Sequence, residues 1–429
     1  MKNLSAVLLL LLSLNSFAQT KSVKKSPPLT EATPTSQGMS PERLALIDDM
    51  IKRSVSDGDF PGAVALIARN GKIVFHNAYG MADNASGRKM KKDDVFRIAS
   101  QTKAITSTAV MVLWEEGRFR LDDPVSKYIP EFKNARVIDT FNESDSTYTT
   151  KSADKEITIR HLITHTSGIG YGVIDGDDRF KKIYHKAGVT DLFTTENISI
   201  EQSVKILAKL PLHHNPGEKF TYSEGLDVLG YFIEVVSEMP FDKFLRKRIF
   251  DPLGMDDTWF YQPKANHSRL VTVQEKKDGK WQKLPYTFYD TDYPIKGAKR
   301  FFSGGAGLSS TAKDYATFLQ MYLNNGELNG VRILSRTTIE TIMANQIGDL
   351  WGDNGEYYGL AFGVVDEIGV GKGGRGSLGT FDWGGYFNTQ YWADPQEKII
   401  GILMKQTRGK VSDQTGWKFR QMVQTAVDD

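Results

Sequence analysis

The chain carries an apolar strand pair near each end, and this placement constrains the fold more than any other feature. Near the N-terminus, residues 63–68 and 73–75 flank Asn70-Gly71, a typical two-residue hairpin turn. Near the C-terminus, residues 390–393 and 399–403 form a second pair around a turn. Helical patterns fill most of the chain between the two pairs. The sequence therefore predicts an α/β (α+β) fold in which both chain ends build one sheet and a helical region is inserted between them.

Helix signals and polar stretches indicate how the 429 residues are organised. Ser40 is a favourable N-cap in front of Pro41, so order is expected to begin there. Residues 134–156 are polar and predict irregular structure. The expected organisation is one domain over residues 40–429, with a helical insertion at about 115–300.

Two segments are predicted to precede this domain. Lys2 and an apolar run over residues 6–14, followed by small residues, are typical of a signal peptide over residues 1–18. Residues 19–39 are polar and rich in Pro, Ser and Thr, which predicts a flexible linker. The protein is therefore expected to be exported and, in a bacterium, to be periplasmic or secreted.

Composition excludes several classes of function. The chain has 54 Lys+Arg and 52 Asp+Glu, a net charge of +2, which gives no basic excess for nucleic acid. It has no cysteine, so disulfides, thiolate zinc sites and iron–sulfur clusters are excluded. The apolar run over residues 6–14 is too short to cross a membrane, and no other candidate span is found. The oligomeric state is left open.

No motif calls for a metal or a cofactor. His161 and His165 lie four residues apart, but the sequence suggests no third ligand. A G-x-G-x-x-G pattern begins at Gly369, but the glycines that follow predict a loop where dinucleotide binding requires a helix. We therefore expect no cofactor, no metal site and a small-molecule substrate.

The S-x-x-K pattern occurs five times, and context separates one copy from the others. Four copies, at Ser22, Ser86, Ser152 and Ser310, lie in the linker, in turn-rich stretches or at the start of an amphipathic helix. The fifth, Ser100/Lys103, lies between apolar residues on both sides, so Ser100 begins a predicted buried helix. Residues three apart on a helix share a face, so the amine is expected beside the hydroxyl.

Ser100 and Lys103 have the chemistry of a nucleophile and its base. Burial disfavours the charged form of a lysine, and a neutral amine accepts the hydroxyl proton. The amide of Ser100, at a helix N-terminus, is free to stabilise an oxyanion. Tyr222, just before another apolar helix, is suited to relay a proton. From the residues alone, a structural helix start and an ordinary core tyrosine remain open alternatives.

Two aromatic and glycine-rich segments, 281–307 and 351–387, are predicted to form the walls of a cleft. Their aromatic residues suggest an apolar pocket, although ordinary packing remains an alternative for each. These residues are Trp281, Tyr286, Phe288, Tyr289 and Trp351.

Taken together, the motifs resemble serine β-lactamases of class C type and penicillin-binding-protein-like hydrolases, and most closely the family VIII carboxylesterases. The resemblance covers about residues 40–425. It implies the β-lactamase/transpeptidase-like fold, with an antiparallel sheet flanked by helices, a helical domain and a cleft between them. The matching segments are 96–103, 162–168, 222–230, 304–308 and 381–385.

The resemblance implies a role for each matching residue. Ser100 is expected to be the acylated nucleophile, Lys103 the general base or its partner, and Tyr222 the residue that passes the proton to the leaving group. The strand segment Trp383-Gly384-Gly385 occupies the place of the lactamase K-T-G motif. Its placement implies that the backbone N–H of Tyr386 is a second oxyanion donor beside that of Ser100.

Two departures from the lactamase pattern affect the substrate. Trp383 stands where lactamases carry a lysine that binds the substrate carboxylate, and Glu224 stands where they carry an asparagine. Glu224 and the Trp383–Gly385 strand are the expected substrate contacts. The sequence thus predicts a serine hydrolase that cleaves carboxylic esters through an acyl-enzyme at Ser100. Alternatives are a β-lactamase or D-amino-acid peptidase on the same site, or a binding or sensor protein without turnover.

Overall fold

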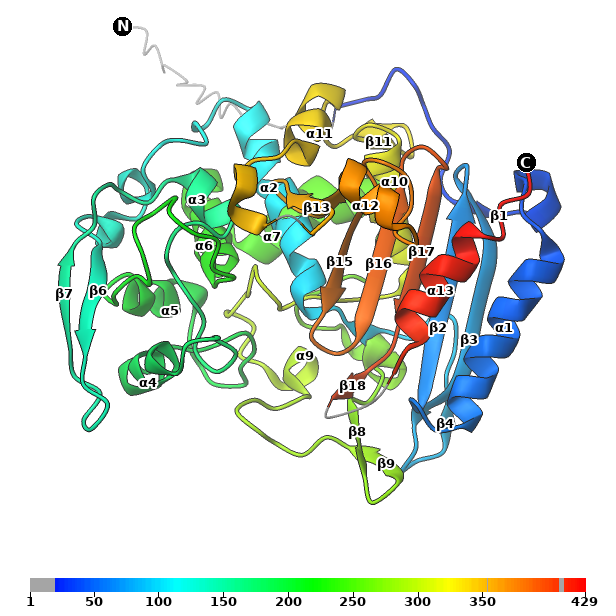
Figure 1. Cartoon of the computed structure of the whole chain (residues 1–429), viewed down its shortest axis with the longest axis horizontal. Helices are drawn as coiled ribbons and strands as arrows, with labels where there is room; N and C mark the ends of the chain where they lie inside the picture. The colour runs from blue at the N-terminus through cyan, green and yellow to red at the C-terminus, as the bar shows by residue number, and fades with distance from the viewer. Residues whose placement is uncertain (1–19, 353, 409–412) are drawn as a thin grey trace, which may run out of the picture.

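The computed structural model describes residues 20–352, 354–408 and 413–429. One large sheet lies between helical layers, and a helical region extends to one side of it (Figure 1). The predicted signal peptide over residues 1–18 lies outside the described residues.

The central sheet joins the two ends of the chain. Strand β17 pairs antiparallel with β2 over Ile399–Met404 and 64–69, so the predicted N- and C-terminal strand pairs meet side by side. The nine strands follow the order β1-β3-β2-β17-β16-β15-β14-β13, with β4 on β3. Their bounds are β1 Thr30–Glu31, β2 Gly62–Arg69, β3 Lys72–Asp83, β4 Arg88–Lys89, β13 Glu356–Tyr358, β14 Gly363–Val365, β15 Phe381–Gly385, β16 Thr389–Asp394 and β17 Ile399–Met404.

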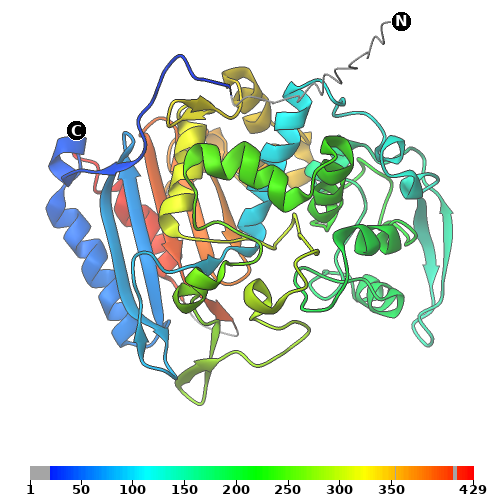
Figure 2. The same ribbon diagram turned by 180° about the vertical axis from the view of Figure 1, so that it is seen from behind.

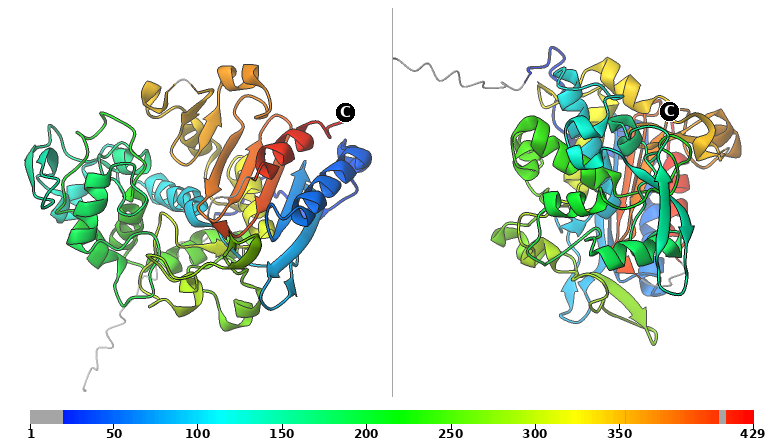
Figure 3. Two further views of the ribbon diagram at one scale, coloured as in Figure 1. Left: turned by 60° about the horizontal axis from the view of Figure 1, so that its bottom comes forward. Right: turned by 90° about the vertical axis from the view of Figure 1, so that its left-hand side faces the viewer.

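Side chains alternate between the two faces of a strand, and in β2 both sets are buried because helices cover each face. In β2, Ala65 and Ile67 pack into one apolar cluster, and Val64 and Leu66 pack into the other. Helices α1 and α13 lie side by side on the first face, and α10 packs against β2, β16 and β17 (Figures 1 and 3). The helices are α1 Pro41–Ser56, α2 Thr102–Glu115, α3 Ile159–Ile163, α4 Asp178–Ala187, α5 Ile200–Leu207, α6 Gly225–Ser237, α7 Phe241–Leu245, α8 Asp251–Leu253, α9 Tyr293–Lys296, α10 Ala312–Leu323, α11 Arg336–Met343, α12 Glu367–Lys372 and α13 Thr415–Gln424.

Local signals in the sequence explain where several elements begin and turn. The Ser40 hydroxyl accepts a hydrogen bond from the backbone N–H of Arg43, which caps α1 as predicted. Asn70 and Gly71 both adopt positive φ angles, of 53° and 75°, which the tight β2–β3 hairpin requires. The short pairs outside the central sheet are β5 Phe96–Arg97 with β10 Ser309–Ser310, β11 Glu327–Leu328 with β12 Val331–Arg332, and β18 Thr407–Arg408 with β8 Gln274–Lys277 and β9 Lys280–Lys283.

The prediction of irregular structure over residues 134–156 is wrong. This segment forms an antiparallel hairpin of β6 (Arg136–Phe141) and β7 (Tyr148–Ser152) at the edge of the helical region, which Figure 2 shows from behind. Of the two strands, only Val137 and Ile138 are buried, so the hairpin lacks the apolar alternation that signals a strand.

The segment before α1 differs from the flexible linker expected over residues 19–39. Ser26 donates hydrogen bonds to the Glu327 carboxylate through its backbone N–H, at 2.9 Å, and its hydroxyl, at 2.5 Å. Strand β1 adds to the sheet edge, and the side chains of Leu29 and Met39 are buried. The polar composition suggested flexibility, but a few buried apolar side chains and one carboxylate are enough to hold the segment in place.

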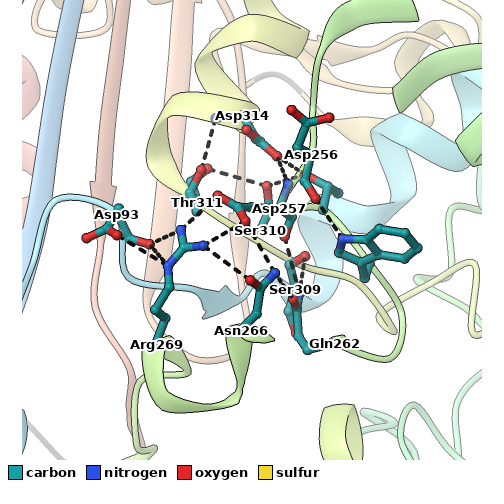
Figure 4. A network of polar contacts seen from close by, with 12 residues as sticks. Asp93, Asp256, Asp257, Gln262, Asn266, Arg269, Ser309, Ser310, Thr311 and Asp314 are labelled. Carbon is teal, nitrogen blue, oxygen red and sulfur yellow. Dashed lines mark hydrogen bonds and ion pairs between the residues drawn. The ribbon is translucent and has the colours of Figure 1, made fainter. Parts of the chain in front are cut away.

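A polar network fixes the loop after α8 (Figure 4). The Asp314 carboxylate accepts hydrogen bonds from the backbone N–H of Asp257 and the hydroxyl of Thr258, both at 2.9 Å. Arg269 forms an ion pair with Asp257 on the same loop. Trp259 exchanges backbone hydrogen bonds with Ser309 of β10, and β10 pairs with β5 just before Ser100. The network therefore supports the segment that presents Ser100.

Candidate active site

Ser100 lies in a short 3-10 turn, η2 (Ala99–Gln101), which leads directly into α2. The turn is anchored on its N-terminal side by Arg97, whose fully buried guanidinium donates to the carbonyl groups of Thr291 and Val271, both at 2.6 Å. Ser100 itself is partly exposed. The predicted nucleophile is therefore held by a rigid support and remains accessible.

Ala99, the residue before Ser100, has a positive φ of 43° although it has a side chain. This conformation is uncommon for alanine and costs free energy, and such residues cluster at functional sites. Ala99 is fully buried, so its surroundings hold it in place. The sharp bend at Ala99 turns the chain from β5 into the helix that begins at Thr102.

Lys103 lies on the first turn of α2, and only 2% of its surface is exposed. Its Nζ lies 3.4 Å from the Ser100 hydroxyl oxygen and donates a 2.7 Å hydrogen bond to the Gly305 carbonyl. The same amine lies 4.6 Å from the centre of the Tyr222 ring and 5.6 Å from that of Tyr171. The structure thus brings the three predicted residues Ser100, Lys103 and Tyr222 together.

Behind Lys103 lies a buried carboxylate that the sequence did not single out. Asp227 accepts a 2.9 Å hydrogen bond from the backbone N–H of Gly305, whose carbonyl receives Lys103. Burial raises the pKa of Asp227, while hydrogen bonds from Ser303 and Gly305 and the nearby Lys103 oppose that rise. A Cβ on Gly304 would lie 2.2 Å from a backbone oxygen of α6, which explains a glycine at this close approach. The motif at 304–308 therefore supports Lys103.

Tyr222 is held by His165 from both sides. The His165 carbonyl accepts a hydrogen bond from the backbone N–H of Thr221 at 2.8 Å, and its ring Nδ1 accepts one from that of Ser223 at 3.2 Å. The two rings, of His165 and Tyr222, are 4.7 Å apart. Burial, and secondarily the charge of Lys103, holds the pKa of His165 well below its usual value. His165 is therefore a neutral positioning residue. It lies in the matching segment 162–168, but no role was predicted for it from the sequence.

Strand β15 forms the opposite side of the site. A Cβ on Gly385 would lie 2.5 Å from the Ile98 carbonyl, so the end of this strand packs directly against the segment before Ser100. The Trp383 indole N–H donates a 3.4 Å hydrogen bond to the Tyr222 hydroxyl. Trp383 also contacts the rings of Tyr358 and Trp351. An aromatic surface therefore occupies the position at which β-lactamases carry a lysine.

Two further residues of the sequence analysis lie elsewhere than expected. Glu224, an expected substrate contact, is only 2% exposed, and its Oε1 has no partner among the described residues. Burial, followed by the neighbouring Asp191, raises its pKa well above the usual value. Trp281 lies on β9 and packs near α1, donating to the Gly58 carbonyl at 3.3 Å, so it is not a wall of the site. Tyr289 does lie in the apolar cluster that contains Ala99 and borders Tyr222.

No helix among the described residues is long and apolar enough to cross a membrane. Within the same ranges, no cluster of three or more His, Cys, Asp or Glu side chains is suited to bind a metal ion.

The fold and the site define the class of protein. Comparison with solved structures gives a TM-score of 0.75 and 26% identity to EstCE1, a hydrolase with promiscuous acyltransferase activity, over 90% of this chain and 99% of that one. A penicillin-binding protein homologue from Pyrococcus abyssi, 22% identical, aligns with a TM-score of 0.64 over 89% of this chain and 76% of its own. The predicted β-lactamase/transpeptidase-like fold is confirmed.

Sequence comparisons place the chain within this class. The model of the Beta-lactamase family matches residues 47–424, and the chain belongs to that family. An uncharacterized protein of Mycobacterium tuberculosis is 31% identical over 82% of this chain and 88% of its own length. Esterase EstB of Burkholderia gladioli is 29% identical over 87% of this chain and 93% of its own. The protein is a serine hydrolase related to β-lactamases and esterases, as predicted.

Proposed function

We propose that the protein hydrolyses carboxylic esters through an acyl-enzyme at Ser100, in the manner of the family VIII carboxylesterases. The observation that carries the proposal is the convergence of three groups. Lys103 Nζ lies 3.4 Å from the Ser100 hydroxyl and 4.6 Å from the centre of the Tyr222 ring. A buried amine beside a partly exposed hydroxyl has the arrangement of an activated nucleophile.

The proposed reaction has two halves. Ser100 Oγ attacks the ester carbonyl carbon and its proton passes to Lys103 or Tyr222, which gives a tetrahedral oxyanion. Collapse breaks the bond to the alcohol oxygen, which takes the proton from Tyr222 and leaves as the alcohol. A water molecule then attacks the acyl-enzyme, gives up a proton to the same pair, and releases the carboxylic acid and Ser100.

The oxyanion donors in this proposal are the backbone N–H groups of Ser100 and Tyr386. The Gly385 carbonyl accepts a hydrogen bond from the N–H of Asn388 on the β16 side. Tyr386 directly follows Gly385, the end of β15 that packs against the Ile98 carbonyl just before Ser100, which makes its N–H the candidate for the second donor. Preorganised amides of this kind contribute about 3 kcal/mol each to transition-state stabilisation.

Aromatic surroundings support esters over lactams as the substrate class. A β-lactam carries a carboxylate that requires a cation at the strand, and Trp383 supplies no charge there. Its indole instead reaches the Tyr222 hydroxyl, at 3.4 Å. Two similar proteins, Esterase EstB and the hydrolase EstCE1, carry names that agree with an ester substrate. A β-lactamase or D-amino-acid peptidase on the same site is the alternative that the assay must separate.

The test compares kcat/KM for p-nitrophenyl butyrate and nitrocefin, with Ser100→Ala as the control. We expect ester turnover well above nitrocefin turnover, both lost in Ser100→Ala, and labelling of the active protein by a fluorophosphonate. Nitrocefin turnover equal to or above ester turnover would overturn the ester assignment. Absence of both turnover and labelling would favour a binding protein.

We also propose that the protein is exported after removal of residues 1–18. The support is the sequence pattern at the N-terminus, a lysine followed by an apolar run and small residues. N-terminal sequencing of protein recovered from the periplasm or medium is expected to begin near Gln19. An intact Met1 on cytoplasmic protein would overturn the proposal.

A further inference from the structure

Arg408 brings a positive charge to the end of the strand that borders Ser100. It belongs to β18, which pairs in parallel with β8. Its guanidinium carbon lies 3.6 Å from the centre of the Tyr386 ring, and its Nη1 donates a 3.1 Å hydrogen bond to the Tyr386 carbonyl. A planar guanidinium stacked on an aromatic ring is held in a defined orientation.

The guanidinium of Arg408 has donors to spare. An arginine carries five N–H donors, and one hydrogen bond from this side chain, to a carbonyl, is seen in the structure. Within the described ranges, no Asp or Glu oxygen lies within ion-pair distance of Arg408, whereas Arg420 of α13 is paired with Asp382. Arg408 is half-buried, so its charge is partly desolvated yet still reachable from solvent. Such an uncompensated cation is suited to bind an anion.

Tyr386 links this cation to the reaction centre. It follows Gly385, whose Cα packs against the Ile98 carbonyl just before Ser100. The end of β15, the start of α2 and β18 gather in the lower centre of the molecule (Figure 1). The ring centre of Tyr289 is 6.2 Å from that of Tyr386. Burial raises the pKa of Tyr289, and the positive charge of Arg408 opposes this rise. Arg408 therefore stands beside the strand end that borders Ser100.

We propose that Arg408 is a specificity-determining residue that binds an anionic oxygen, such as a carboxylate, on the acyl or the alcohol part of the substrate. This inference rests on the proposed esterase function. Trp383 places no cation in the middle of β15, and Arg408 supplies one at the end of the same strand. A charge-assisted hydrogen bond of this kind is expected to favour an anionic ester over a matched neutral one by about tenfold or more.

The kinetic test uses two pairs of esters. Mono-p-nitrophenyl glutarate against p-nitrophenyl butyrate places the carboxylate on the acyl part, and 4-acetoxybenzoate against phenyl acetate places it on the alcohol part. In Arg408→Gln, we expect the ratio of kcat/KM for anionic over neutral ester to fall at least about tenfold in one pair, mainly through KM. Arg336→Gln, on the exposed face of α11, is the matched control and leaves both ratios unchanged.

A binding measurement separates this inference from the proposed function, because it needs no turnover. Monomethyl glutarate and neutral dimethyl glutarate are titrated into the Ser100→Ala protein and followed by intrinsic tryptophan fluorescence. We expect Arg408→Gln in that background to weaken only the monomethyl ester, at least about tenfold in Kd. Unchanged kinetic ratios in both pairs, or equal Kd values with and without Arg408, would overturn the inference. If the anion binds through Arg408 but no ester is turned over, the proposed function fails and the inferred anion site stands.

Discussion

Lys103→Met is the substitution that best separates catalysis from folding at this site. Methionine keeps a buried, unbranched side chain of similar length but removes the amine, which is 2% exposed and bonded to the Gly305 carbonyl. Leaving that carbonyl without its donor costs about 1–3 kcal/mol. Burying an apolar side chain in place of an amine offsets part of this cost. The free energy of unfolding is therefore expected to change by no more than about 2 kcal/mol, a few degrees in Tm.

The activity of Lys103→Met is expected to fall far more than its stability. Loss of a positioned acid–base group typically lowers the rate by about 10²–10⁴-fold, and Lys103 is the amine 3.4 Å from the Ser100 hydroxyl. The assay is kcat/KM for p-nitrophenyl butyrate, together with thermal unfolding of each variant. Lys313→Met is the matched control, because Lys313 has the same S-x-x-K spacing but an exposed side chain. Retention of more than a tenth of the wild-type kcat/KM in Lys103→Met would refute the role given to Lys103.

Three other substitutions test the positioning, charge and substrate arguments. His165→Ala removes the ring acceptor of the Ser223 N–H. We therefore expect kcat to fall at least about tenfold and the free energy of unfolding to fall by about 2–4 kcal/mol. A wild-type kcat would contradict the role of His165 in positioning Tyr222. Burial raises the pKa of Asp314 to about 6, above its unfolded value, so its stabilising effect is complete below about pH 4 and is lost as the pH rises through 6. Urea unfolding of Asp314→Asn is expected to show a gain over wild type of about 2 kcal/mol at pH 7 relative to pH 4, and a pH-independent difference would contradict this. Trp383→Lys is expected to raise the nitrocefin-to-ester ratio of kcat/KM at least about tenfold, because the ammonium can bind the lactam carboxylate; an unchanged ratio would show that Trp383 does not select against lactams.

Sequence patterns predicted local structure well where one physical signal dominated. The hairpin at Asn70-Gly71 was predictable because those residues tolerate positive φ angles, and the cap at Ser40 because its hydroxyl accepts a helix N–H. The β6–β7 hairpin was missed because only Val137 and Ile138 are buried there. The segment at residues 20–39 was misjudged because its fixed contacts, such as Ser26 with Glu327, are made to residues far along the chain.

The candidate site was likewise predictable only where residues close in the sequence form it. Helix geometry puts Lys103 on the same face as Ser100, so the spacing alone predicted that pair. Asp227 received no role from the sequence, because its link to Lys103 runs through the backbone of Gly305, 78 residues away. Glu224 was expected at the substrate, but the packing of α6 buries it beside Asp191.

The sequence by itself determined the two strand pairs, the helix starts and the Ser100/Lys103 pair, because each follows from backbone geometry within a few residues. Only the tertiary structure decided which distant groups meet at that pair. It placed Gly305 behind Lys103, brought Trp383 to the Tyr222 hydroxyl and stacked Arg408 on Tyr386. These contacts join residues 22 to 202 positions apart. They depend on how the strands and helices pack, and no local spacing encodes that packing.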